Sequence, residues 1–315
     1  MNRLAIISNP RSHRNLHGPA VLCDISQYPF LAGFAEPGSQ AALLASLAQF
    51  RQRGVNIIAI NGGDGTVRDV LTAMWRIDPE WRPALTIIPG GKTNLIANDV
   101  GCAAPGPAGL RQILEAASHN RLDRHRVNRP VIDIIRTGSP GTPICGLFFG
   151  AGAFSRGTEL AQTEANALGL YQGLAVAWTI GSMLVRSLRG RAGEAAPMAL
   201  SAGGGTVLQG EVFIMLATSS QRIILGLNPF WGPQTGAIRY TAIAGPPVRL
   251  LAALWPVLRG RPRPWMAAAG YRSGSADYLN LHLTSRFTVD GELFDPGPAG
   301  MIELTARRTM DFVHP

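Results

Sequence analysis

A glycine-rich turn near the start of the chain carries the first residues that could do chemistry. Asn61-Gly62-Gly63-Asp64-Gly65-Thr66 lies between a predicted strand and a stretch whose apolar residues have helical spacing. Glycines let backbone amides approach a polyphosphate, and the following helix N-terminus supplies partial positive charge. Asp64 would then hold a metal ion or handle a proton, because a carboxylate otherwise repels phosphates. The alternative is a tight turn in which Asp64 caps the following helix.

A second glycine turn, Pro89-Gly90-Gly91-Lys92-Thr93-Asn94, also separates a predicted strand from a helix. Its Gly-Lys-Thr triplet is not a P-loop, because that motif needs a glycine where this chain has Thr86, inside the strand. Of the 29 basic residues, 28 are arginines and one is Lys92. A lysine in a phosphate-binding turn would neutralise phosphoryl oxygens. The alternative for Lys92 is a solvated side chain at a helix start.

The elements that would position these turns alternate in type. A strand is predicted around Leu4 to Ile7, a helix from Gln40 to Gln52, and strands at Val55 to Ile60 and Leu85 to Ile88. Strands that alternate with helices predict a parallel sheet, whose ligands bind at the carboxyl ends of the strands. Both glycine turns fall at such ends.

The pattern changes from about Arg129 onward. Short apolar and β-branched runs there predict an antiparallel β domain; they are Val131 to Ile135, Ile144 to Phe149, Val212 to Ala217 and Leu279 to Thr284. Helical insertions are predicted at Glu159 to Leu188 and Val248 to Leu258. The chain therefore combines two kinds of architecture.

Composition limits the class of protein. At 315 residues, with 46% hydrophobic and 16% charged residues, the chain is globular and long enough for two domains. Its three cysteines are too scattered for a disulfide framework or a zinc site, which fits a reducing compartment. The N-terminal apolar run is too short for a secretory signal, so a cytoplasmic location is expected. The window Leu168 to Leu188 is interrupted by polar residues and predicts a buried or interfacial helix rather than a spanning one.

The net charge of +9 indicates an anionic partner. No zinc-finger spacing or RNA-binding aromatic signature is present, so we expect a membrane surface rather than nucleic acid. Trp255 and Trp265 bracket three arginines, and three more arginines end the other long apolar segment. These arginines are Arg259, Arg261, Arg263, Arg186, Arg189 and Arg191. The alternative is that they are ordinary solvated charges.

Four ordered motifs resemble the diacylglycerol kinase catalytic family, which includes bacterial lipid kinases and the sphingosine and ceramide kinases. Asn9-Pro10-Arg11-Ser12 resembles the family's first turn, with His13 where glycine is usual. Gly62 to Thr66 matches its GGDGT motif. Pro89, Gly91 and Asn94 match its next turn, with Lys92 at the usual threonine. Phe287 to Glu292 matches the late strand and Asp-Gly-Glu.

This resemblance implies ATP and Mg²⁺ as cofactors, with ATP between the two domains. The implied nucleotide-binding residues are Asn9, Gly62, Gly63, Asp64, Gly65, Thr66, Gly91, Lys92, Thr93 and Asn94. The implied catalytic residues are Glu292 and Asp64, with Glu292 accepting the proton of a lipid hydroxyl. The alternative for Glu292 is a simple hairpin position, because Asp-Gly is a strong turn signal.

Besides His13 and Lys92, three further positions depart from the family pattern. Leu95, Phe154 and Thr235 stand where relatives often have aspartates, and the last belongs to a pair that supplies a structural magnesium ligand. We therefore expect no structural metal held by the protein, while the catalytic magnesium arrives with ATP.

The sequence thus predicts an α/β nucleotide-binding domain with a parallel sheet at residues 1–128, to which the tail 306–315 returns. A β-rich, sandwich-like lipid-substrate domain is predicted at residues 129–305. The expected protein is a cytoplasmic, peripherally membrane-associated lipid kinase acting on diacylglycerol or a similar lipid. Two alternatives remain: a small-molecule kinase similar to NAD kinases, or a nucleotide- or lipid-binding protein without catalysis.

Overall fold

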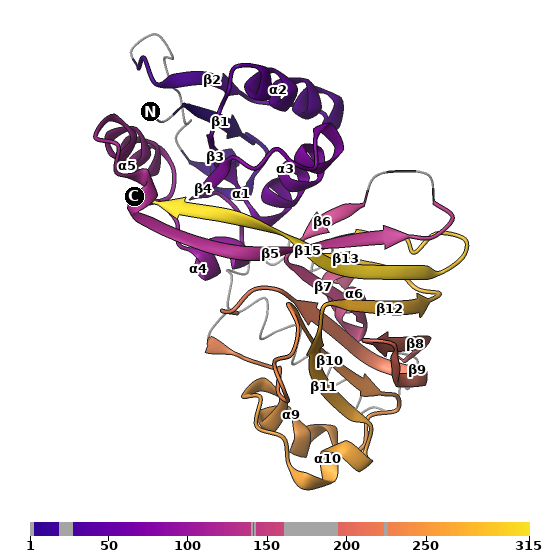
Figure 1. Ribbon diagram of the computed structural model, residues 1–315. Coiled ribbons are helices and arrows are strands. Elements are labelled where there is room, and N and C mark those ends of the chain that lie inside the picture. The colour runs from indigo at the N-terminus through magenta and orange to yellow at the C-terminus, as the bar shows by residue number, and fades with distance from the viewer. Residues whose placement is uncertain (1–2, 19–27, 140, 142, 161–194, 224–225) are drawn as a thin grey trace. The chain divides into compact units, whose positions relative to one another are not determined.

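Two long strands, β5 (His125–Arg136) and β15 (Met301–His314), carry the chain between two compact units. The computed structural model describes residues 3–18, 28–139, 141, 143–160, 195–223 and 226–315 (Figure 1). The first unit comprises Met1–Arg129 with Thr309–Pro315, and the second comprises Pro130–Arg308.

The first unit is built on a parallel sheet. Its strands lie in the order β2 (Leu31–Ala35), β1 (Leu4–Ser8), β3 (Ile57–Gly62) and β4 (Ala84–Pro89). Phe312 of β15 pairs with Leu85 of β4, also in parallel. Every residue of β1, β3 and β4 is buried. These strands are continuous apolar runs because both faces of the sheet are covered.

Helices cover the two faces of this sheet. Figure 1 shows α5 (Pro107–Ser118) on one side, with α2 (Gln40–Gln52) and α3 (Asp64–Ile77) on the other. Leu110 and Ile113 of α5 pack in one core cluster with residues of β1 and β3. Short helices α1 (His13–His17) and α4 (Leu95–Val100) follow β1 and β4. Each glycine turn therefore lies between a buried strand and the helix that follows it.

The second unit consists mainly of antiparallel strands, in the order β14-β13-β7-β9-β8-β12-β15. Their bounds are β7 (Phe148–Gly152), β8 (Ala196–Ala202), β9 (Gly205–Thr218), β12 (Tyr278–Leu283), β13 (Phe287–Val289) and β14 (Glu292–Phe294). Strand β10 (Ile238–Ala244) pairs with both β9 and β11 (Tyr271–Ala276), and β6 (Ile144–Gly146) pairs with β5.

Two apolar clusters stabilise the second unit. The larger one lies between strands and includes Phe149, Leu281 and Phe287. The smaller one packs α9 (Leu250–Leu258) and α10 (Pro264–Ala268) against β9, β10 and β11. Helix α6 (Ala153–Leu160) directly follows β7.

The predicted fold class, a parallel α/β part followed by a β-rich part, is confirmed. The predicted strand Ile144 to Phe149 is divided into β6 and β7, because the amides of Leu147 and Phe148 bond to the carboxylate of Asp290. Most of the helix predicted at Glu159 to Leu188, with the apolar window inside it, lies outside the described residues. In the part of the chain that the structure describes, no helix combines the length and apolar character required to traverse a bilayer.

Candidate functional site

Three turns meet at the carboxyl ends of β1, β3 and β4. The side-chain amide of Asn9 donates to Thr66 Oγ1 at 2.9 Å, and the Asn9 backbone N–H donates to the carbonyl of Asn61 at 2.9 Å. The N–H of Gly90 donates to the carbonyl of Gly62 at 2.8 Å. The structure therefore joins the Asn-Pro turn and both glycine turns, which the sequence places in separate motifs.

The glycines let the two turns pack backbone against backbone. A Cβ atom on Gly63 would lie 2.8 Å from the Cα of Gly91, and one on Gly91 would lie 2.7 Å from the Cα of Gly63. A Cβ on Gly62 would lie 2.5 Å from Thr66 Oγ1. A side chain at these positions would separate the turns. Their close contact is thus a reason for glycine besides access of the backbone to phosphates.

Asp64 links the two turns. It is the first residue of α3, whose N-cap is Gly63, but its carboxylate accepts hydrogen bonds from the backbone N–H groups of Leu95 and Ile96, each at 2.9 Å. Burial raises the pKa of Asp64, while the hydrogen bonds from Ile96 and Leu95 act in the opposite direction. The Asp64 side chain therefore accepts hydrogen bonds from the first two backbone N–H groups of α4. It caps a different helix from its own, and these contacts give no evidence that it binds a metal ion.

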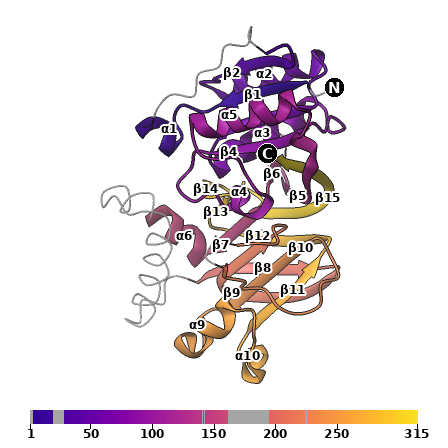
Figure 2. The same ribbon diagram turned by 90° about the vertical axis from the view of Figure 1, so that its left-hand side faces the viewer.

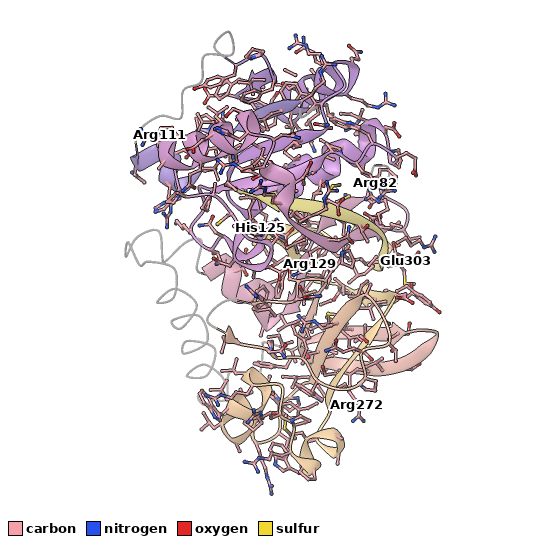
Figure 3. All side chains as sticks on the ribbon, turned by 60° about the vertical axis from the view of Figure 1, so that its left-hand side comes forward. Arg82, Arg111, His125, Arg129, Arg272 and Glu303 are labelled. Carbon is pink, nitrogen blue, oxygen red and sulfur yellow. The ribbon has the colours of Figure 1, made fainter. Side chains whose placement is uncertain are left out.

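The short helix α4 is fixed at its other end by a buried ion pair. Arg129, labelled in Figure 3, bonds to Asp99 through Nε at 2.8 Å and through a terminal nitrogen at 3.2 Å. The side chain of Asp99 is fully buried and that of Arg129 nearly so. A two-point arginine–carboxylate contact orients both groups. Helix α4 thus lies between Asp64 at one end and Arg129 at the other.

Asn94 shapes the second turn from within. Its backbone is left-handed, with φ of 49°, a conformation that asparagine tolerates better than most residues. Its side-chain Oδ1 accepts from the Gly91 N–H at 2.8 Å, and its Nδ2 donates to the Gly91 carbonyl at 2.9 Å. The side chain of Asn94 therefore closes the turn, and contact with a phosphate stays a prediction.

Lys92 and His13 lie beside this turn. Lys92 is exposed. The N–H of Arg14 donates to the Gly90 carbonyl at 2.9 Å, which places helix α1 and its first residue, His13, next to the same turn. Burial lowers the pKa of His13, and the positive charges of Lys92, His17 and Arg14 lower it further. His13 and Lys92, both departures from the family pattern, thus share one surface.

Glu292 lies in the second unit, at the start of β14. It pairs with Val289 across a two-residue turn, Asp290-Gly291, in which both residues have positive φ, at 47° and 87°. The hairpin expected from Asp-Gly is present, and the exposed Glu292 follows it. A hairpin position and a catalytic role are compatible, so the role of Glu292 stays a prediction.

The sequence drew attention to Asp290 only as part of the Asp-Gly-Glu motif, and the structure gives its side chain a role of its own. Its buried carboxylate accepts from the N–H of Phe148 at 2.9 Å and from the N–H of Leu147 at 3.2 Å. Its own N–H donates to the Phe148 carbonyl at 3.0 Å. Through these bonds, the turn that precedes Glu292 is attached to the start of β7.

The structure places the residues at Leu95, Phe154 and Thr235. At position 95 the contact with Asp64 is made by the backbone N–H, so it does not depend on the leucine side chain. Phe154 lies against Gly150, where an added Cβ would meet its ring at 2.2 Å, and its ring centroid is 5.2 Å from that of Phe148. The N–H of Thr235 donates to Ser275 Oγ at 2.6 Å. Among the described residues, no three His, Cys, Asp or Glu side chains are grouped so as to hold a metal ion.

Comparison with known proteins agrees with these motifs. Residues 3–124 match the family model described as "Diacylglycerol kinase catalytic domain". A protein from Escherichia fergusonii described as "Probable lipid kinase YegS" is 35% identical over 95 residues, and its counterpart from Salmonella heidelberg is 36% identical over 98 residues. Each match spans 30% of this chain and 31% of the relative.

The fold of the whole chain has solved counterparts. A crystal structure of a diacylglycerol kinase from Bacillus anthracis covers 100% of this chain and 97% of its own, with a TM-score of 0.64 and 15% sequence identity. At that identity the likeness shows the fold alone. The resemblance drawn from the motifs is therefore confirmed: residues 3–124 match the diacylglycerol kinase catalytic family, and the chain has the fold of a solved diacylglycerol kinase.

Proposed function

We propose that this protein is an ATP-dependent lipid kinase that transfers the γ-phosphate to the hydroxyl of diacylglycerol or a similar lipid, as a cytoplasmic enzyme at the membrane surface. One observation carries the proposal: the two glycine turns meet backbone to backbone at the carboxyl edge of the parallel sheet, at the N-terminus of α3. That arrangement suits a polyphosphate. The match of this region to a kinase catalytic domain supports the same reading.

The residues present fit the phosphates of ATP. Gly63 to Thr66 present backbone at the start of a 14-residue helix. Lys92 adds a cationic group beside the second turn, and His13 adds a ring that a polyphosphate would favour in its protonated form. Both oxygens of Asp64 accept backbone N–H groups, so Asp64 sets the spacing of the turns. Magnesium bound to the nucleotide would neutralise charge on the transferred group.

Glu292 supplies the base in this proposal. Its carboxylate accepts the proton of the lipid hydroxyl while the hydroxyl oxygen forms a bond to the γ-phosphorus. The bond from that phosphorus to the bridging oxygen breaks, and the electron pair leaves with ADP. Asp290 positions Glu292 through the hairpin that it anchors to Leu147 and Phe148.

The test uses the full chain with γ-labelled ATP and magnesium, offered either a total bacterial lipid extract or NAD. We expect label in the organic phase and none in NAD. Label in NAD would favour the alternative of a small-molecule kinase. Binding of ATP without any labelled product would favour a protein that has lost catalysis.

A further inference from the structure

Helix α9 presents an apolar face that the described residues of its unit leave exposed. Ala253 and Val257 are buried in the small cluster with Met266 and Tyr271. On the opposite face, Leu251 is 57% exposed and Trp255 is 61% exposed, and Val248, just before the helix, is 50% exposed. Leu251 and Trp255 are four positions apart in α9, so their side chains lie on one face and, with Val248 two residues before the helix, form an exposed apolar stripe. Large exposed apolar side chains grouped in this way mark an interaction surface.

The stripe lies in a strongly basic part of the chain. Residues 212–276 contain seven arginines and no aspartate or glutamate. Four of these arginines, all exposed, flank α9 or lie between α9 and α10; they are Arg249, Arg259, Arg261 and Arg263. The guanidinium carbon of Arg259 is 4.3 Å from the ring centroid of Trp255. Apolar anchors and cations therefore occupy the same surface. Figures 1 and 2 show α9 and α10 side by side, next to β11.

The two tryptophans that bracket the arginines in the sequence differ in the structure. Trp255 is exposed, whereas Trp265 is partly buried, with its ring edge-on to Tyr271 at 5.8 Å and the Arg249 guanidinium carbon 5.8 Å from its own centroid. Trp265 thus belongs to the small cluster, and Trp255 is the available anchor. The other arginine group considered in the sequence, Arg186, Arg189 and Arg191, lies outside the described residues.

We propose that the surface formed by Val248, Leu251, Trp255 and these four arginines docks on an anionic lipid bilayer. The apolar stripe enters the headgroup region with its helix parallel to the membrane plane, while the arginine stems lie along it and the guanidinium groups bind lipid phosphates. An acidic protein or a nucleic acid would match the charge but would leave the aliphatic face without a matching partner. Tryptophan is favoured at membrane–water interfaces because one side of the ring system is apolar and the other polar.

This inference rests on the proposed function, since a lipid kinase must approach a substrate in a membrane. Its test needs no catalysis. The full chain is sedimented with vesicles of phosphatidylcholine alone, or of phosphatidylcholine with an equal amount of phosphatidylglycerol, at low and high salt. We expect binding to the anionic vesicles that falls as salt is added.

Two variants and one control locate the binding. Arg259→Gln with Arg261→Gln and Arg263→Gln should weaken binding about 100-fold, given about 5-fold per arginine. Leu251→Ser with Trp255→Ser, which leaves the charge unchanged, should weaken it about 10-fold or more. The control, Arg76→Gln with Arg111→Gln and Arg307→Gln, removes the same charge at exposed positions elsewhere and should bind nearly as the unaltered chain does. Unchanged circular dichroism and melting temperature show that each variant is folded.

The proposal is overturned if the Leu251 and Trp255 variant binds as the unaltered chain does, or if the control loses as much binding as the Arg259 group. Tighter binding to duplex DNA than to anionic vesicles would also overturn it. If the protein binds vesicles through this surface but phosphorylates no lipid, the docking proposal stands and the proposed function is wrong. If the protein phosphorylates lipid in micelles and both variants bind vesicles normally, the proposed function stands and the docking proposal is wrong.

Discussion

The carboxylate of Asp64 holds the backbone of Leu95, with 2.9 Å between Oδ2 and the Leu95 amide nitrogen, and its second oxygen holds the amide of Ile96 at the same distance. One side chain in the first glycine turn therefore fixes the start of the helix that follows the second turn. The contact is compatible with leucine at position 95, because Asp64 accepts its hydrogen bond from the Leu95 backbone N–H and not from the side chain.

Replacing Asp64 with asparagine tests this link. The amide can accept from only one of the two N–H groups, and its NH₂ group would face the other. We expect Asp64→Asn to lower the free energy of unfolding by about 1–3 kcal/mol, and to weaken ATP binding because the turns lose their spacing. Thermal denaturation and ATP titration measure the two effects. Glu80→Gln, a control that removes one charge at an exposed position of the same unit, where the partner Arg82 is also exposed, should change both much less. Identical stability and ATP affinity in Asp64→Asn would show that the link is dispensable.

Asp290 is expected to position the catalytic hairpin. Asp290→Ala removes the acceptor for the amides of Leu147 and Phe148 and places alanine at a φ of 47°, so we expect a loss of about 1–3 kcal/mol in urea denaturation. Asp290→Asn keeps one acceptor and tolerates the left-handed backbone, so its loss should be smaller. Phosphorylation should fall mainly in kcat, with little change in the KM for ATP. An alanine variant as stable and active as the unaltered chain would contradict this account.

Lys92 is expected to contact the nucleotide's phosphates. Because a lysine ammonium interacts with a polyphosphate more strongly than with a monophosphate, Lys92→Met should weaken ATP more than AMP, and adenosine least. Isothermal titration with the three ligands measures the difference. Arg76→Met, at the far end of α3, is the control and should change none of them. Equal affinities of the Lys92 variant for all three ligands, unchanged from the original, would leave Lys92 as a solvated side chain.

The affinity for ATP should depend on the protonation of His13. Burial and the neighbouring charges of Lys92, His17 and Arg14 lower the pKa of His13, so the ring is neutral at pH 7. A bound polyphosphate would stabilise the protonated His13 ring and so raise the pKa of His13. By linkage, ATP should bind more tightly as the pH falls through the pKa range of His13. ATP titrations from about pH 8 to about pH 5.5 measure the trend. The increase should be reduced in His13→Gln and kept in His17→Gln. If the unaltered chain, His13→Gln and His17→Gln all show the same dependence of ATP affinity on pH, His13 does not contribute to ATP binding.

The fold was predictable where local pattern and packing agree. The helix Gln40 to Gln52 was predicted with the bounds that the structure has, because Ser39 caps it and an uninterrupted helix-forming run follows. The strand at Ile144 to Phe149 was predicted as one element and is two. The cause is the side chain of Asp290, 142 residues from Phe148, and a contact at such separation leaves no local signal.

The site was predictable in its residue types but not in their roles. Glycines between strand and helix indicated a phosphate-binding turn, yet the contact of Gly63 with Gly91 depends on neighbouring strands and is invisible in either motif. Asp64 was considered as a metal or proton carrier, or as the cap of its own helix. Its partners at Leu95 and Ile96 follow only from the sheet order, which brings β3 and β4 side by side.

The central claim is that this chain phosphorylates a lipid hydroxyl with Glu292 as the base. The most direct measurement follows transfer of label from γ-labelled ATP to diacylglycerol in mixed micelles, with the unaltered chain and with Glu292→Gln. The account predicts labelled lipid phosphate with the unaltered chain, a rate reduced roughly 10²–10⁴-fold in the variant, and equal ATP affinity in both. Lipid phosphorylation at the same rate in Glu292→Gln would remove Glu292 from the mechanism, and no transfer to any lipid by the unaltered chain would contradict the proposed function itself.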